Sequence, residues 1–137
     1  MDPARVVPGL FYGMTMNSNS APQSIPASTT RELILWLVGR RRRLRVTGES
    51  MLPHLPPGQE VLTVSPGHDG RPPQVGDVVV IRHPQQPETL ILKRVAHVLP
   101  DGGYVLLGDN PAASTDSRTF GPMTQDKILG RIVCRFP

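Results

Sequence analysis

The chain has 137 residues, enough for one domain with a hydrophobic core and too few for two such domains. Its sixteen prolines and thirteen glycines separate short runs of valine, isoleucine and leucine, a composition typical of a turn-rich β fold. The single cysteine, Cys134, excludes an internal disulfide and a thiolate-cluster metal site. The four histidines show no ligand spacing, so we predict neither a metal nor another cofactor.

The net charge of +4 lies in the N-terminal part of the chain. Residues 1–43 hold six arginines against two acidic side chains, whereas residues 44–137 hold nine basic and nine acidic side chains. Aromatic residues make up only 4% of the chain, too few for a surface that stacks on bases. We therefore expect no nucleic-acid partner for the body of the chain.

The N-terminal region divides into two parts. Residues 1–27 are rich in proline, serine, asparagine and alanine and carry no periodic pattern, which predicts a disordered tail. Residues 28–43 are interpreted as a short helix with a basic arginine run. A threonine–glutamate capping box at residues 29–32 begins the helix, and the pattern extends it to Arg40 or Arg41.

An apolar run at residues 33–38 would surround this helix on all sides. Three interpretations follow: the helix docks on the domain or a partner, it lies at a membrane surface with the arginines at the headgroups, or it contacts nucleic acid. The run is much shorter than the roughly 20 residues that span a bilayer, so no transmembrane helix is expected. Any membrane contact through residues 31–45 is therefore predicted to be peripheral.

The pattern after residue 43 predicts short β-strands separated by turns. A continuous apolar run, Val78 to Ile81, is typical of a strand that is covered on both faces. The strands are expected at residues 44–46, 60–64, 77–82, 89–98, 104–107 and 128–136. This spacing indicates a small, closed or half-closed β-barrel.

Residues 46–53 form a constrained turn around one serine. Gly48 permits a positive φ or the close approach of a ligand, and Pro53 restricts the residue before it to extended geometry. Such a turn can aim the hydroxyl of Ser50. A serine is a weak nucleophile without a base, so this interpretation requires one elsewhere in the chain.

Lys93 is the candidate base. In an extended strand it shares a face with Ile91 and Val95, and aliphatic neighbours remove water from its amine. Desolvation disfavours the charged form and lowers the pKa, as a lysine that accepts protons near neutral pH requires. The alternative is a lysine that extends from a strand edge into solvent.

A loop dense in short polar side chains, residues 108–118, contains the remaining candidates. The hydroxyl of Ser114 is placed to hold a neutral lysine amine, and Asp116 and Arg118 are expected to pair and brace the loop. Asx and Ser/Thr turns offer the alternative explanation, a rigid loop without chemistry.

Together these segments resemble the serine peptidases of family S26, the type I signal peptidase family. The nucleophile box, Ser-Met-x-Pro preceded by glycine, stands at residues 48–53, and the Gly-Asp-Val-Val strand box stands at residues 76–79. The Lys-Arg box is at residues 93–94, and the Gly-Asp-Asn-x-x-x-Ser-x-Asp-Ser-Arg box is matched throughout residues 108–118. The resemblance covers residues 44–137 and implies the small β-barrel peptidase domain that the family shares with LexA-type repressors.

The resemblance also implies roles for individual residues. Ser50 would be the nucleophile, Lys93 the general base, and Ser114 the residue that orients Lys93. The Ser50 backbone N–H would form part of the oxyanion hole, and Gly48 stands where many bacterial relatives place a second, hydroxyl donor. The residues expected to give structural support are Asp109, Asp116 and Arg118.

The substrate is inferred from departures from the family pattern. Signal peptidases carry transmembrane helices before the serine box, and we expect this chain to be cytoplasmic and to act on a soluble protein precursor. Its small size and the Arg-His-Pro at residues 82–84 are most similar to the nickel-type superoxide dismutase maturation proteases. That resemblance implies removal of the N-terminal leader from the dismutase precursor, which exposes the nickel-binding N-terminus.

Two alternatives stay open. The first is a signal peptidase-like enzyme at the membrane surface that cleaves exported preproteins. The second is a non-catalytic β-barrel that binds a partner or nucleic acid through the basic arm. A self-cleaving repressor is disfavoured, because the chain has no Ala-Gly pair and no recognisable DNA-binding domain.

Overall fold

The computed structural model describes residues 24–68 and 71–137, so most of the predicted tail lies outside the described residues. The tail prediction is wrong for its last residues. Ile25 is buried in the core, and the Arg135 amide donates a hydrogen bond to the Pro26 carbonyl at 2.8 Å. One apolar residue beside a proline gives no periodic signal, which is why the sequence pattern did not separate this segment from the tail.

Six antiparallel strands form a single sheet, which confirms the predicted mainly β fold. The observed bounds agree with the predicted ranges to within a few residues. The strands are β1 (Arg42–Arg45), β2 (Glu60–Val64), β3 (Val78–His83), β4 (Gln86–Val98), β5 (Tyr104–Leu107) and β6 (Ile128–Arg135).

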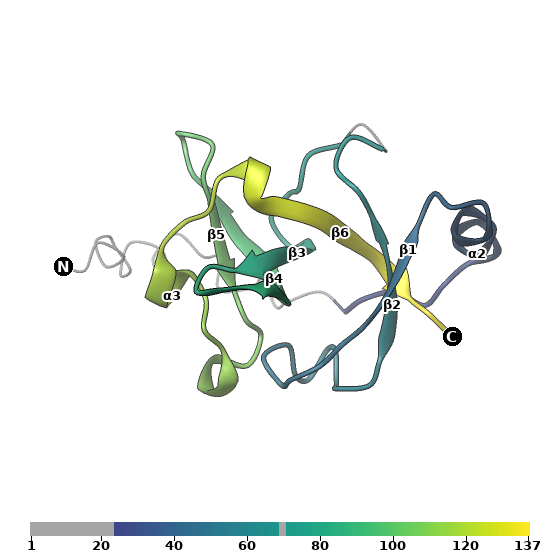
Figure 1. Ribbon diagram of the computed structural model, residues 1–137, viewed down its shortest axis with the longest axis horizontal. Coiled ribbons are helices and arrows are strands. Elements are labelled where there is room, and N and C mark those ends of the chain that lie inside the picture. Colours follow the sequence, from purple (N-terminus) through teal and green to yellow (C-terminus); the bar gives the residue numbers. More distant parts are fainter. Residues whose placement is uncertain (1–23, 69–70) are drawn as a thin grey trace.

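Strand β6 joins the two halves of the sheet, whose order is β1-β2-β6-β3-β4-β5. Its beginning pairs with β3, where Ile128 lies opposite Ile81, and its end pairs with β2, where Cys134 lies opposite Leu62. Figure 1 shows β3, β4, β5 and α3 (Ser117–Phe120) on one side of β6, and β1 and β2 on the other. Strands β1 and β5 are the two edges of the sheet.

Two clusters of buried apolar side chains stabilise the two halves. The first surrounds the serine turn and contains Ile25, Val46, Met51, Leu55, Val61, Val78 and Ile132. The second lies under β3, β4 and β5 and contains Val79, Ile81, Val95, Tyr104, Leu106 and Ile128. Neighbouring residues of β3, Val78 and Val79, face different clusters, so this strand is covered on both faces as its continuous apolar run predicted.

Helix α2 (Thr30–Leu37) begins as predicted and ends earlier. The Thr29 side chain accepts a hydrogen bond from the Glu32 amide, as expected for an N-cap. Gly39 adopts a φ of 82°, its amide bonds the Trp36 carbonyl, and the next amide bonds the Leu35 carbonyl. These two bonds form a Schellman motif, so the extension to Arg40 or Arg41 was wrong because the prediction overlooked a glycine stop.

The arginine run is divided between a turn and a strand. Arg42 begins β1, an edge strand, and the side chains of Arg43 and Arg45 lie 3.6 and 3.2 Å from the Glu60 carboxylate on β2. Charged side chains on an edge strand discourage pairing with other chains. Part of the run assigned to the helix is therefore part of the sheet.

Short helical segments complete the chain. The loop after β5 contains a 3-10 turn, η1 (Pro111–Ala113), followed by α3, and a second turn, η2 (Gln125–Lys127), precedes β6. Within residues 24–68 and 71–137, no helix has the length and apolar character that a membrane crossing requires.

Candidate active site

The serine turn is fixed to the core on both sides of Ser50. Val46 at its start and Met51 and Leu55 at its end are all buried in the first cluster. The amides of His54 and Leu55 both donate to the Met51 carbonyl at 3.0 Å, which closes the turn after the serine. Gly48 has a φ of 79°, a conformation that side chains rarely adopt, so glycine is needed there.

Lys93 lies in the interior of the sheet, not at a strand edge. It occupies β4 opposite Val79 of β3, and only 2% of its surface is exposed. Its Nζ donates a hydrogen bond to Ser114 Oγ at 3.1 Å. The predicted desolvation and the predicted contact with Ser114 are therefore both confirmed, and the interpretation as a solvent-extended lysine is wrong.

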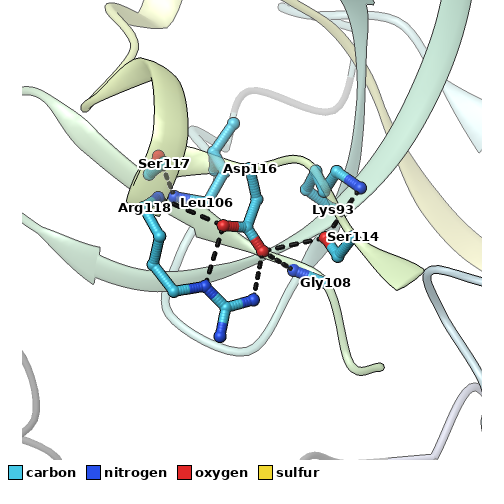
Figure 2. Close-up of polar contacts among 7 residues, drawn as sticks. All are labelled: Lys93, Leu106, Gly108, Ser114, Asp116, Ser117 and Arg118. Carbon is cyan, nitrogen blue, oxygen red and sulfur yellow. Dashed lines mark hydrogen bonds and ion pairs between the residues drawn. The ribbon is translucent and has the colours of Figure 1, made fainter. Parts of the chain in front are cut away.

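A buried carboxylate organises the loop after β5. Figure 2 shows Asp116 between Lys93 and Arg118, with the donors of its hydrogen bonds around its two oxygens. Its Oδ2 accepts from Ser114 Oγ and from the Gly108 amide, each at 2.8 Å, and its Oδ1 accepts from Arg118 Nε at 2.9 Å. Because the Ser114 hydroxyl donates its hydrogen bond to Asp116, its oxygen can accept a hydrogen bond from Lys93. The predicted Asp116–Arg118 pair is confirmed.

Gly108 brings the loop and the serine turn together. A Cβ on this residue would lie 2.2 Å from Ser114 Oγ and 2.8 Å from the Ser50 carbonyl oxygen. Two residues later, Asn110 donates its amide to the same Ser50 carbonyl at 2.8 Å and its side-chain amide to the Glu49 carbonyl at 3.0 Å. Ser50 and the Lys93–Ser114 pair are therefore held in adjoining positions by a backbone approach that only glycine allows.

A second connection, which the sequence did not reveal, runs through Asp109. Arg94 Nε and a terminal nitrogen donate to the two Asp109 oxygens at 2.9 Å each, and His54 Nδ1 lies 3.0 Å from Oδ2. Arg94 also donates to the Gly76 carbonyl at 2.8 Å. This network ties the serine turn to the strand that carries Lys93, and it shows why Asp109 supports the site.

His54 is a structural part of this network, through its contact with Asp109. We expect His54→Ala to lower the free energy of unfolding by about 1–2 kcal/mol, because a hydrogen bond to a charged group is lost. Chemical denaturation with the exposed His68→Ala as a control tests this. Equal stability of the two variants would contradict it.

The charges around Lys93 set its protonation. Burial lowers the pKa of Lys93, the Asp116 carboxylate opposes that effect, and the Arg118 guanidinium adds to it. Burial also opposes ionisation of Asp116, but hydrogen bonds from Arg118, the Gly108 amide and Ser114 outweigh it and keep the pKa of Asp116 below its ordinary value. The site thus holds an ionised carboxylate beside an amine that loses its proton more easily than an ordinary lysine.

Arg118 offers a test of this electrostatic arrangement. Replacing Arg118 with methionine removes a positive charge that lowers the pKa of Lys93. The Asp116 carboxylate, which raises the pKa of Lys93, remains. We therefore expect the rising limb of any activity that needs neutral Lys93 to move to higher pH, with several-fold less activity near neutral pH. A pH profile of kcat/KM for Arg118→Met tests this, and a limb that moves to lower pH would contradict it.

A groove of about 160 Å³ passes beside the serine. One wall is the segment from Leu44 to Met51, which contains Gly48 and Ser50, and the other is residues 89–92 at the approach to Lys93. The lining is mostly aliphatic. In the described parts of the chain, no three His, Cys, Asp or Glu side chains gather as a metal would need.

Comparison with known proteins agrees with this arrangement. The family model "Signal peptidase, peptidase S26" matches residues 33–98 and 96–136. The chain belongs to the S26 signal peptidase family. The matched residues include the serine turn, both strands around Lys93 and the whole loop from Gly108 to Arg118, so the family assignment covers every part of the candidate site.

Individual relatives share about a third of the aligned residues with this chain, or match only a short part of it. This member of the S26 family is 33% identical over 112 residues to the mitochondrial ATP-independent inner membrane protease subunit 1a of Arabidopsis thaliana, over 66% of this chain and 67% of that protein. It is likewise 33% identical to subunit 1b over 110 residues, or 65% of that protein. Signal peptidase IB of Staphylococcus aureus is 46% identical over 41 residues, which is 30% of this chain and 22% of that relative.

Proposed function

We propose that the protein is a serine endopeptidase with a Ser50–Lys93 dyad that removes an N-terminal leader from a precursor protein. The observation that carries the proposal is the desolvated Lys93 amine, which donates to Ser114 on a loop bonded directly to the Ser50 turn. A neutral amine that donates one N–H to Ser114 keeps its lone pair for a proton from Ser50. Membership of a peptidase family supports the same roles.

The proposed reaction has two stages. As Ser50 Oγ attacks the scissile carbonyl, its proton moves to Lys93 Nζ and an oxygen–carbon bond forms. Collapse of the tetrahedral intermediate breaks the peptide bond, the leaving amine takes the proton from Lys93, and an ester remains on Ser50. Water then attacks the ester while Lys93 accepts its proton, the bond to Ser50 Oγ breaks, and Lys93 returns the proton to Ser50 Oγ. The leader leaves as a carboxylic acid, which ionises to a carboxylate.

The backbone around Ser50 supports a role in stabilising the oxyanion. Within the described residues, the Ser50 N–H makes no hydrogen bond, although the neighbouring carbonyls of Glu49 and Ser50 are both bonded to Asn110. A free, rigidly held N–H beside the nucleophile is the donor that an oxyanion hole requires. Gly48 contributes no side-chain donor, so any second donor comes from another group.

The precursor of a nickel-type superoxide dismutase is the proposed substrate, and the cytoplasm is the proposed compartment. The support is the resemblance of this small domain to the proteases that mature that enzyme, and the mainly aliphatic groove agrees with an extended leader segment. Exported preproteins are the alternative substrate class, suggested by relatives that are named signal peptidases.

The decisive experiment incubates the protein with purified dismutase precursor and measures intact masses. We expect loss of the leader with the native protein and no cleavage with Ser50→Ala, because the ester cannot form. Ser65→Ala serves as the matched control. If the precursor stays intact while exported preproteins are cleaved, the dyad stands and the substrate changes. Cleavage of either by Ser50→Ala would overturn the proposed mechanism.

A further inference from the structure

The loop after β5 is bonded to strand β4 at two consecutive residues. The pairing of β5 with β4 ends where Leu107 lies opposite Arg94, and the loop begins at the next residue. Consecutive side chains of a strand point to opposite faces. On one face Lys93 donates to Ser114 at 3.1 Å. On the other, Arg94 donates to both oxygens of Asp109 at 2.9 Å each, so the loop is fixed to the strand that carries the proposed base.

The same loop holds the serine turn on both sides of Ser50. Asn110 donates its backbone amide to the Ser50 carbonyl at 2.8 Å and its side-chain amide to the Glu49 carbonyl at 3.0 Å. After the serine, the contact with the loop comes from His54, whose Nδ1 lies 3.0 Å from Asp109 Oδ2. Asn110 therefore fixes the turn up to the nucleophile, and His54 fixes the part that follows.

The chemistry of the second contact determines which atom carries the proton. An ionised carboxylate accepts hydrogen bonds and cannot donate one, so Nδ1 of His54 is the donor to Asp109. The side chains of His54 and Asp109 are 22% and 4% exposed, so most of this bond is shielded from water. Asp109 Oδ2 also accepts from Arg94 at 2.9 Å. A single carboxylate oxygen thus joins the serine turn to strand β4.

Apolar packing alone does not define the orientation of the turn. Met51 and Leu55 are buried in the first cluster and hold the turn against the core. Hydrophobic contacts are non-directional, so they fix the depth of the turn and leave its rotation to hydrogen bonds. A rotation about the Ser50 carbonyl, which is bonded to Asn110, would move Ser50 Oγ relative to Lys93 Nζ.

We infer that His54 is a positioning residue of the proposed peptidase, which fixes the direction of Ser50 Oγ by donating from Nδ1 to Asp109. The inference rests on the proposed Ser50–Lys93 reaction, in which His54 takes no proton. A histidine that only stabilises the fold would affect the free energy of unfolding, whereas a positioning residue also affects turnover by the folded enzyme. A displacement of about 1 Å costs roughly 10²-fold in rate, so a small rotation is sufficient.

Two substitutions of His54 separate these roles. His54→Leu removes the donor and keeps an apolar side chain of intermediate size, whereas His54→Asn places an amide N–H near the position of Nδ1. We expect His54→Leu to lower kcat for leader cleavage by about 10- to 100-fold, with KM within about twofold of native. In His54→Asn, kcat should return to within about threefold of native, because a bond to the Asp109 carboxylate is restored.

The comparison requires folded protein and a matched control. Rates are measured at a temperature at which denaturation curves show every variant folded, so that a loss of stability does not appear as a loss of turnover. His68→Leu is the control, because His68 is exposed and lies outside the site. It should keep the native kcat and KM.

Hydrogen exchange provides a readout that does not require cleavage. The Asn110 amide is bonded to the Ser50 carbonyl, so a turn that rotates should expose this amide more often. We expect exchange at Asn110 to be about tenfold faster in His54→Leu and close to native in His54→Asn. The Met123 amide, bonded to the Tyr104 carbonyl at 2.8 Å, is the control, and its exchange should not change.

Each outcome supports or contradicts the inference. A native kcat in His54→Leu, or a kcat in His54→Asn as low as in His54→Leu, would show that His54 does not position the nucleophile. Unchanged exchange at Asn110 would contradict it as well. If the native chain cleaves neither the dismutase precursor nor exported preproteins, the proposed function fails, and exchange at Asn110 still decides whether His54 holds the serine turn.

Discussion

Lys93→Met is expected to abolish cleavage while leaving the protein at least as stable as the native chain. In the proposed reaction the amine accepts the Ser50 proton, and loss of a general base costs a factor of about 10²–10⁴. Methionine has a similar length and no charge, so it fills the same buried position beside Val79. Cleavage of the precursor followed by mass spectrometry measures the first effect.

The stability of Lys93→Met provides a second test, of whether burial disfavours the charged form of Lys93. Burial lowers the pKa of Lys93 in the folded protein below the ordinary lysine value of 10.5. Below the folded pKa the native chain bears the cost of a buried ammonium, and that cost disappears as the pH rises towards 10.5. We expect Lys93→Met to be more stable than the native protein by about 1 kcal/mol at neutral pH.

The difference in stability between Lys93→Met and the native protein should therefore become smaller as the pH rises. Thermal unfolding of both proteins over a series of alkaline pH values measures this difference. Lys127→Met is the matched control, because this exposed residue is the other lysine of the chain. It should change neither cleavage nor the pH dependence of stability. An active Lys93→Met enzyme would refute the proposed dyad, and a large loss of stability at neutral pH would show that the amine is structural.

The strands could be predicted because each is a short apolar run between glycines and prolines. Glu60–Val64 and Tyr104–Leu107 were placed at their observed bounds for this reason. The end of α2 was not, because helix periodicity continues through residue 38 and only the positive φ of Gly39 terminates it. The arginine run gave no signal for β1, since its place in the sheet depends on pairing with Glu60 and its neighbours in a distant strand.

The site could likewise be predicted only where local sequence patterns or family motifs indicate it. Alternation in β4 predicted that Lys93 is desolvated, and the family motifs suggested Ser50 and Ser114 as its partners. The link between His54 and Asp109 joins residues 55 positions apart, so no local pattern could reveal it. A histidine directly after Pro53, four positions after Ser50, was the available clue, but the sequence did not show that Asp109 is its partner.

We expect the methyl group added by Gly108→Ala to disturb the geometry of the site more than a methyl group added at any other single residue. The backbone of Gly108 lies outside the positive-φ region, so alanine suits its conformation and the cost is steric. The new Cβ would lie 2.2 Å from Ser114 Oγ and 2.8 Å from the Ser50 carbonyl, and one of these groups must move. We expect a loss of about 1–3 kcal/mol in the free energy of unfolding. Cleavage should fall by roughly 10²-fold or more, because a shift of about 1 Å at a reacting group costs that much.

Gly103→Ala is the matched control for this prediction. Its Cβ would meet Asp101 Oδ1 at 3.2 Å, and this exposed side chain can move away at the expense of the hydrogen bond that it accepts from the Gly103 amide. Stability should therefore fall less than in Gly108→Ala, and cleavage should stay close to native. A split between kcat and KM distinguishes displacement of the dyad from general unfolding: the Gly108 variant should lose kcat and keep a near-native KM. If Gly108→Ala cleaves the precursor normally, the loop and the serine turn do not approach as closely in the working enzyme, and the proposed alignment of Ser50 with Lys93 and Ser114 is wrong.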